Sequence, residues 1–156
     1  GTGMSTSKIA ADHPDALVIG IDKSSDRLSK HLRVPHQNYH LFQATCEHVW
    51  AELVEAQVRC QQHYLLYPNP WPKKGHLKRR IHGHPSFPLL KTLGGVIEVR
   101  SNWKIYVDEF AKAAKLLGLQ AETTALSVTD PLTLFERKYA LDHQGLWRCT
   151  ARGLDH

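Results

Sequence analysis

Short runs that are typical of strands recur along the chain. They are ALVIGID (16–22), NYHLFQA (38–44), HYLLY (63–67) and VIEVRS (96–101), of which the second is the weakest. ALVIGID up to its final acid, and HYLLY after its first residue, are apolar throughout and predict buried strands. A strand that is covered on both faces has no polar face, so its sequence is continuously apolar rather than alternating. The pattern therefore favours a sheet that is covered by helices.

Amphipathic segments separate these runs and predict helices. They span residues 4–13, 24–32, 46–56, 85–93 and 102–118. The last is the clearest, because Trp103, Tyr106 and Phe110 recur at helical spacing and Gly118 can end the helix. Strands and helices are therefore expected to alternate through most of the chain.

The C-terminal part follows a different pattern. Residues 121–128, 133–141 and 146–151 predict strands with no long helix between them. We therefore expect an α/β fold whose open sheet is mostly parallel and has antiparallel C-terminal strands. The length of 156 residues indicates one domain, over residues 1–156.

The positive charge is concentrated in one segment. The net charge is +5, yet no acid occurs between Glu55 and Glu98, where seven Lys and Arg residues lie. Without those seven, thirteen basic residues face fifteen acids. A focused cationic segment suits a polyanionic partner, because each neutralised phosphate releases counterions.

Other features of the composition exclude some classes of protein. No apolar run approaches the roughly 20 residues that a membrane-spanning helix needs, so we expect no membrane partner. The cysteines Cys46, Cys60 and Cys149 lack metal-ligand spacing and are interpreted as reduced thiols of a cytoplasmic protein. The eleven histidines are scattered, and the closest pair, His82 and His84, lacks nearby cysteines or carboxylates, so we expect no metal site.

Two features near the start of the chain favour a nucleotide-like cofactor. Gly1 and Gly3 precede the first predicted helix, where missing side chains let a ligand approach the backbone. Asp22 ends the first apolar run, nineteen positions after Gly3, and such an acid can accept hydrogen bonds from a ribose diol. The same aspartate can instead cap the next helix, and the spacing does not separate the two roles.

The most unusual segment is the loop YPNPWPKKGHLKRR, residues 67–80. Three prolines, one tryptophan and five Lys or Arg residues directly follow a predicted strand there. Because open α/β sheets bind ligands beyond the carboxyl ends of their strands, we expect this loop at the ligand site. The prolines stiffen it, and its cations suit phosphates. Trp71 can pack under the loop or stack on a base, and packing is the preferred interpretation.

This loop closely resembles the DPWPK…H…RR signature of the bacterial tRNA (guanine-N7-)-methyltransferases, which use S-adenosylmethionine. SNWKIY (101–106) and TLFERKYALDHQGLW (133–147) are similar to that family's TDW…Y and TKFE…G…W segments, in the same order. The resemblance covers essentially the whole chain. It implies a Rossmann-like class I methyltransferase sheet, with the chain starting inside the glycine motif and the first strand missing upstream of Gly1. It also implies methyl transfer to a guanine N7 of tRNA, by a monomer or homodimer in the cytoplasm.

The resemblance implies roles for individual residues. Those matched to cofactor binding are Gly1, Gly3, Asp22, Thr45 and Asn69, and Asn69 is also matched to the catalytic position. Those matched to substrate binding are Lys73, Gly75, His76, Lys78, Arg79, Arg80, Asn102, Thr133, Phe135 and Glu136.

Several matched positions depart from the family's pattern. Thr45, Asn69 and Asn102 stand where the family has acids, and Leu134 replaces a lysine. Guanine N7 carries a lone pair and no proton, so its methylation needs alignment and close approach but no general base. An asparagine can orient a base, although it does not stabilise the positive charge that forms on the purine. Methyl transfer is therefore the leading prediction.

Two alternatives stand beside it. The first is a relative that binds RNA without methylating it, or that has another target, and the three lost acids favour it. The second is a nicotinamide-dependent oxidoreductase, because the glycines and Asp22 suit that cofactor as well. The basic loop and the lack of a recognisable hydride-transfer site argue against the oxidoreductase.

Overall fold

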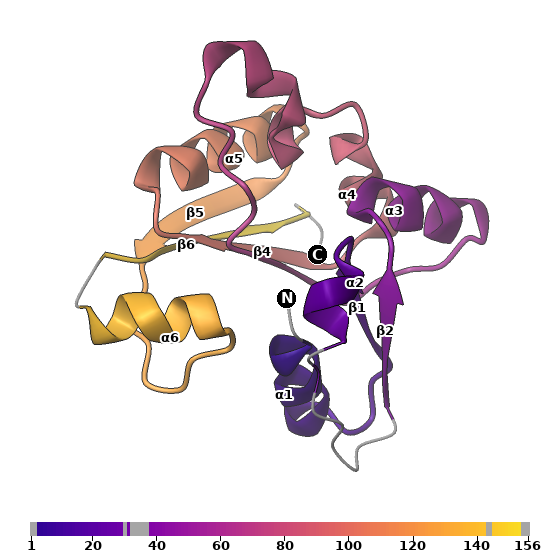
Figure 1. Ribbon diagram of the computed structural model, residues 1–156. Helices are drawn as coiled ribbons and strands as arrows, with labels where there is room; N and C mark the ends of the chain where they lie inside the picture. The colour runs from indigo at the N-terminus through magenta and orange to yellow at the C-terminus, as the bar shows by residue number, and fades with distance from the viewer. Residues whose placement is uncertain (1–2, 30, 32–37, 143–144, 154–156) are drawn as a thin grey trace.

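Six strands alternate with helices in the part of the chain that the computed structural model describes, residues 3–29, 31, 38–142 and 145–153 (Figure 1). The strands are β1 (Val18–Asp22), β2 (Tyr39–Gln43), β3 (Gln62–Leu66), β4 (Val96–Ser101), β5 (Gln120–Ala125) and β6 (Trp147–Arg152). The α-helices are α1 (Met4–Asp12), α2 (Ser25–Leu28), α3 (Cys46–Glu55), α4 (Phe87–Leu93), α5 (Lys104–Leu116) and α6 (Leu134–Leu141). Two short 3₁₀ helices, η1 (Lys74–Arg79) and η2 (Ile81–Gly83), follow β3.

The described strands form two sheets. β1 and β2 pair in parallel. The second sheet has the order β3-β4-β6-β5, in which β3 and β4 are parallel and β6 runs antiparallel to β4 and β5. The predicted combination of parallel strands with antiparallel C-terminal strands is thus confirmed. The expected strand upstream of Gly1 stays a prediction.

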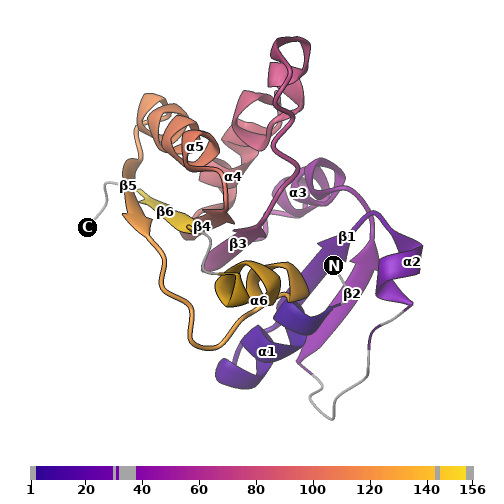
Figure 2. The same cartoon turned by 60° about the vertical axis from the view of Figure 1, so that its left-hand side comes forward.

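The core lies between the second sheet and its covering helices. α3, α4 and α5 lie on one side of this sheet, and α6 lies on the other (Figures 1 and 2). The buried side chains include Tyr106 and Phe110 from α5, Leu90 from α4, and Val99 and Cys149 from the strands. The apolar stripe predicted on residues 102–118 therefore faces the centre of the core.

One predicted strand is wrong. Residues 133–141 form the helix α6, which begins with a capping arrangement that its sequence T-x-x-E encodes. The Thr133 hydroxyl accepts a hydrogen bond from the Glu136 N–H at 2.9 Å, and the Glu136 carboxylate accepts one from the Leu132 N–H at 3.0 Å. The first bond satisfies a backbone donor that a helix start leaves unpaired, and the second fixes the residue before the cap, so both favour the helix over a strand.

The other predicted elements are confirmed, with shifted ends. The strand expected over 121–128 spans Gln120–Ala125, and the helix expected over 24–32 includes α2, while residues 30 and 32 lie outside the described residues.

Gly20 shows why α1 can pack closely on β1. A Cβ atom at Gly20 would lie 2.2 Å from the Thr6 hydroxyl oxygen, so a larger residue would push α1 away.

Among the described residues, no helix is long and apolar enough to cross a membrane.

Candidate active site at the carboxyl edge of the sheets

The ends of β1 and β2 bring Asp22 and Thr45 to one edge. Asp22 is paired with Gln43 in the parallel ladder, and the Ala44 N–H donates to the Asp22 carbonyl at 3.1 Å. Thr45 follows directly and precedes α3, where its side chain is exposed and does not cap the helix. The two cofactor residues predicted from separate segments therefore follow neighbouring strands.

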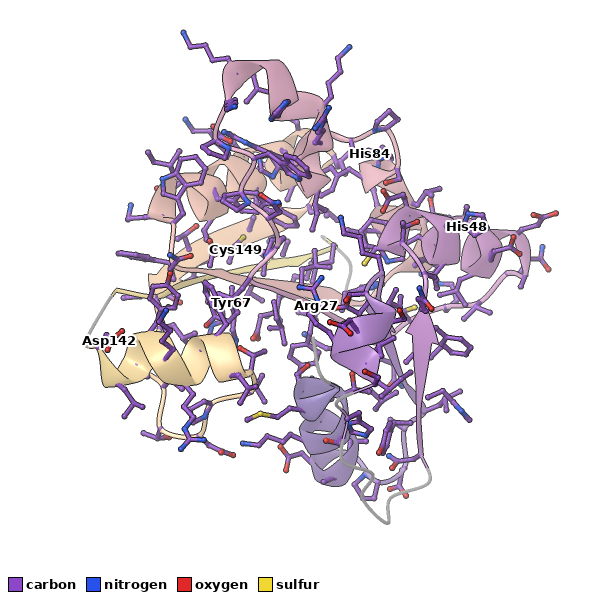
Figure 3. The ribbon with its side chains drawn as sticks, viewed as in Figure 1. Arg27, His48, Tyr67, His84, Asp142 and Cys149 are labelled. Carbon is purple, nitrogen blue, oxygen red and sulfur yellow. The ribbon has the colours of Figure 1, made fainter. Side chains whose placement is uncertain are left out.

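Asp22 holds the turn that leads from β1 into α2. Its Oδ1 atom accepts a hydrogen bond from the Ser24 N–H at 2.8 Å and lies 3.4 Å from the Arg27 guanidinium, whose position Figure 3 shows. Its side chain keeps 12% of its surface exposed. The N-cap of α2 is Ser24, whose Oγ atom accepts the Arg27 N–H at 3.2 Å, so the predicted helix-capping role of Asp22 is wrong. Asp22 instead fixes the turn before α2, and binding of a cofactor ribose stays a prediction.

Gly3 begins α1 in the left-handed region, at φ 88°. A Cβ atom there would lie 2.7 Å from His31 Nδ1 and 2.8 Å from Leu41 Cδ1, so its close neighbours are protein side chains. The turn therefore needs glycine for backbone conformation and packing, whether or not a ligand approaches it. Gly1 lies outside the described residues.

The parallel strands β3 and β4 bring Asn69 and Asn102 to the same edge. Leu66 is paired with Arg100 in this ladder, and the Tyr67 N–H donates to the Arg100 carbonyl at 2.8 Å. Asn69 and Asn102 follow within three residues of these partners, and both side chains are exposed. The Asn69 Oδ1 atom accepts a hydrogen bond from the Trp71 N–H at 3.1 Å, which closes a tight turn.

The loop 67–80 is held in an unusual backbone conformation. Tyr67 and Trp71 have φ values of 53° and 45°, in the left-handed region that residues with a side chain seldom adopt. Arg80 closes the loop, because its Nε donates to the Trp71 carbonyl at 3.1 Å and its Nη1 donates to Glu109. The guanidinium carbon also lies 5.2 Å from the centre of the Trp103 ring.

Arg80 therefore occupies a different place from the one that the resemblance implies. Only 4% of the residue is exposed, and Glu109 neutralises its charge. A buried, paired guanidinium holds the loop and is not available to grip a phosphate, so we correct its substrate-binding assignment. The neighbouring Tyr106 hydroxyl accepts the Ile81 N–H at 3.3 Å, and burial raises the pKa of Tyr106 to about 12.

The other predicted cations of the loop lie on the surface. Lys73, Lys78 and Arg79 are exposed, as is Gly75, so these positions remain accessible to a partner. The Arg79 guanidinium lies 5.0 Å from the centre of the Trp71 ring, and the His76 ring meets the Trp71 ring edge-on at 5.5 Å. These contacts agree with the packing role that was preferred for Trp71.

A buried carboxylate connects α6 to the sheet. Glu136 is fully buried and accepts hydrogen bonds from the Tyr67 hydroxyl and from Arg100 Nη1, the latter at 3.0 and 3.1 Å. Tyr67 lies between the end of β3 and α6, as Figure 3 shows. Burial and the hydrogen bond to Glu136 raise the pKa of Tyr67. Burial lowers the pKa of Arg100, but hydrogen bonds to Glu98 and Glu136 outweigh it and raise that pKa overall.

Two further residues predicted to contact substrate lie at the start of α6. Thr133 caps the helix through its hydroxyl. Phe135 is 42% exposed, and its ring centre lies 5.0 Å from that of Tyr67 and 4.4 Å from that of Tyr139. Phe135 therefore adds an accessible aromatic surface beside the Tyr67 ring.

The sequence analysis missed Tyr67, Arg100 and Glu109 as residues that shape this edge. One signal was available: Glu98 and Arg100 are charged residues two positions apart within a predicted strand, VIEVRS. Where the sheet covers such a strand its charges require partners, because burying an unpaired charge is costly. Glu98 Oε2 and Arg100 Nε in fact lie 2.8 Å apart.

The polar groups at this edge are of the kinds that a nucleoside cofactor requires. Within the described residues, no group of three or more His, Cys, Asp or Glu side chains is arranged to hold a metal ion. Asp22 offers a partly exposed carboxylate at the end of β1, and Thr45 offers an exposed hydroxyl beside it. A carboxylate and a hydroxyl suit the polar groups of a ribose and a base.

Comparison with known proteins defines the class. The family described as "Putative methyltransferase" matches residues 1–149. The chain belongs to this methyltransferase family, which argues against the nicotinamide-dependent alternative.

Sequence relatives have a common name, tRNA (guanine-N(7)-)-methyltransferase. The one from Thiobacillus denitrificans is 26% identical over 94% of this chain and 69% of its own length. The Yersinia enterocolitica protein is 29% identical over 94% of this chain and 67% of its own length. The Aquifex aeolicus protein is 27% identical over 97% of this chain and 54% of its own length. The chain thus spans about two thirds of the length of the first two relatives and about half of the length of the third.

Two solved methyltransferase structures have a similar fold. An antibiotic-related methyltransferase has a TM-score of 0.67 and 16% identity, over 97% of this chain and 83% of that chain. A variant of the 16S rRNA (adenine(1408)-N(1))-methyltransferase from Catenulisporales acidiphilia has a TM-score of 0.65 and 18% identity, over 99% of this chain and 84% of that chain. At this identity the likeness concerns the fold, and it supports the Rossmann-like methyltransferase architecture.

Proposed function

We propose that the protein transfers a methyl group from S-adenosylmethionine to N7 of a guanine in tRNA. One observation carries the proposal: Asp22, Thr45, Asn69 and Asn102 follow four strand ends, and the acid-free cationic loop follows one of them. The family membership supports methyl transfer. The relatives' names support the guanine of tRNA, and the rRNA methyltransferase solved with SAM as cosubstrate supports the cofactor.

The cofactor half of the site consists of residues after β1 and β2. Asp22 would accept hydrogen bonds from the ribose hydroxyls, and the exposed Thr45 hydroxyl would contact the adenine. S-adenosylmethionine, when bound, supplies an electrophilic methyl group on its positively charged sulfur. Because the guanine N7 lone pair can attack that group directly, the protein has to align the two reactants and needs no proton acceptor at N7.

Asn69 is the residue that we assign to the reacting centre. Its Oδ1 atom accepts the Trp71 N–H, so its amide N–H groups are the part of the side chain that can donate to a ligand. An amide donor can orient the guanine, but it carries no negative charge to stabilise the purine as it becomes positive. Asn69 therefore contributes alignment rather than electrostatic stabilisation.

The substrate half of the site is the exposed part of the cationic loop. Lys73, Lys78 and Arg79 are exposed and would neutralise phosphates of the tRNA near the reacting guanine. The closing contacts of Arg80 tie the loop backbone at Trp71 to α5, so less of the loop has to be fixed when RNA binds. Such preorganisation lowers the entropy that binding would otherwise cost.

The test is methyl transfer to unmodified tRNA, followed by chemical cleavage at N7-methylguanine. We expect incorporation into a specific guanine and none into a transcript made with 7-deazaguanine, which lacks the N7 nucleophile. Equal incorporation into both transcripts would exclude N7 as the target. Binding of both cofactor and tRNA without any methyl transfer would favour the RNA-binding relative, to which the neutral Thr45, Asn69 and Asn102 also point.

A further inference from the structure

Glu136 is a fully buried carboxylate, and all its described partners belong to the protein. Oε1 accepts hydrogen bonds from the Leu132 N–H at 3.0 Å and from Arg100 Nη1 at 3.1 Å. Oε2 accepts the Tyr67 hydroxyl and the same Arg100 nitrogen at 3.0 Å. The carboxylate therefore connects three segments that are distant in sequence.

These contacts occupy both oxygens of the carboxylate and shield it from solvent. Three donor groups surround it, with Arg100 Nη1 bridging the two oxygens, and none of the Glu136 side chain is exposed. The N1–H and 2-amino groups of a guanine could bond to Glu136 only by displacing Arg100, Tyr67 or Leu132. Displacing Arg100 would leave a largely buried guanidinium with fewer partners, which is costly.

The partner on the loop side, Tyr67, begins the segment that carries Asn69. Tyr67 has a left-handed φ of 53°, a strained conformation that persists only where surrounding contacts fix it. The Tyr67 hydroxyl donates to the Glu136 carboxylate. The Tyr67 N–H donates to the Arg100 carbonyl at 2.8 Å, and the Arg100 side chain is itself paired with Glu136. Glu136 and Arg100 thus fix both ends of Tyr67, two residues before Asn69.

We infer that Glu136 is a positioning residue, which acts through Tyr67 to place Asn69, rather than a contact to the substrate base. The inference rests on the proposed function for its catalytic consequence and replaces the substrate contact that the family resemblance implies. The T-x-x-E segment then has two tasks: it starts α6, and it locks α6 to the turn of the catalytic loop. The exposed residue of the segment that can meet a substrate is Phe135.

The test compares Glu136→Gln, Tyr67→Phe and the double variant with the parent in steady-state methylation of tRNA. Tyr67→Phe keeps the ring contact with Phe135 and removes only the hydroxyl, so it remains informative if Glu136→Gln fails to fold. Glu55→Gln, which removes the same charge from an exposed position at the end of α3, is the matched control. Hydrogen exchange of the Leu132 and Tyr67 amides gives a readout that does not depend on activity.

For a positioning residue, both single variants lower kcat about tenfold and leave the KM for tRNA within about twofold. The double variant is no slower than the slower single variant, because both changes break one connection. Exchange at the Leu132 and Tyr67 amides becomes about tenfold faster in Glu136→Gln.

The inference would be overturned if Glu136→Gln raised the KM for tRNA at a normal kcat while Tyr67→Phe changed neither constant. That result would establish a direct contact between Glu136 and the tRNA. If the parent itself does not methylate tRNA, the proposed function fails, and hydrogen exchange alone decides the positioning role. Unchanged exchange at both amides in Glu136→Gln would then refute it.

Discussion

The Arg80 guanidinium donates to the Glu109 carboxylate, 29 residues away, and this ion pair closes the cationic loop onto α5. The pair separates Arg80 from its neighbours Lys78 and Arg79, which are exposed. Three adjacent basic residues therefore have two different tasks. Their substitutions should have correspondingly different effects.

Arg80→Ala should destabilise the fold by about 1–3 kcal/mol. The change leaves Glu109 without its guanidinium partner and removes the donor to the Trp71 carbonyl. The loss of stability is limited because the Glu109 side chain is 40% exposed, so that solvent can hydrate its charge. Urea unfolding monitored by tryptophan fluorescence measures it. Lys78→Ala in the same assay is the control, and equal stability of the two variants would remove the structural role of Arg80.

The double variant Lys78→Ala/Arg79→Ala should bind tRNA more weakly and with a shallower salt dependence. Each lost phosphate contact lowers the slope of log affinity against log salt by about 0.7–0.9, so the pair should lower it by about 1.5. Fluorescence anisotropy between low and moderate salt gives the slope. Lys112→Ala/Lys115→Ala removes the same charge from exposed positions on α5, and an identical slope in both double variants would show that the loop has no special role.

Asp22→Asn should weaken the binding of S-adenosylmethionine by about 1–3 kcal/mol and leave tRNA affinity unchanged. The asparagine keeps an oxygen for the Ser24 N–H, so this turn bond survives while one acceptor for the ribose is lost. Calorimetry measures the change, with the exposed Asp26→Asn as control. Unaltered cofactor affinity would leave Asp22 with its role in the turn alone.

Asn69→Asp should raise the single-turnover rate of methyl transfer. One carboxylate oxygen can still accept the Trp71 N–H, and the other adds a negative charge beside the purine as it becomes positive. We expect an increase of about 10-fold or more, since removing a stabilising group at a reacting centre commonly costs 10²–10³-fold. A clear decrease would mean that the amide N–H groups make a necessary contact, and that the site has adapted to them.

Stability should fall as the pH is lowered from 6.5, partly because of His82. Burial lowers the pKa of His82 below 6.5, although contact with Glu109 opposes the shift. Below pH 6.5 the unfolded chain therefore binds a proton that folded His82 does not, which favours unfolding until the folded pKa is passed. Glu109, whose pKa is also lowered, adds its effect below pH 4.5.

Urea unfolding at several pH values tests this prediction. His82→Gln should flatten the dependence between pH 6.5 and the folded pKa, where one such group contributes at most about 1.4 kcal/mol per pH unit. His48→Gln, at an exposed position of α3, should not. The same slope in the parent and in His82→Gln would contradict the assignment.

The sequence by itself determined most of the secondary structure and the place of the cationic loop. Continuous apolar runs predicted β1 and β3, and helical spacing of apolar residues predicted α5, because both patterns depend on neighbouring residues alone. The order of these elements then puts Asp22 and Asn69 at strand ends, where an α/β sheet binds its ligands. The acid-free segment between Glu55 and Glu98 likewise needed only counting.

Only the tertiary structure decided which charged residues are buried. Arg80 belongs to a basic run that is typical of a solvated loop, and Glu136 belongs to a segment whose pattern predicts a strand. Both side chains are nevertheless buried. Their partners come from distant parts of the chain, 29 residues away for Arg80 and 36 and 69 residues away for Glu136. A charge can leave water only where such partners compensate its desolvation, and no local pattern shows which residues the fold will bring to it.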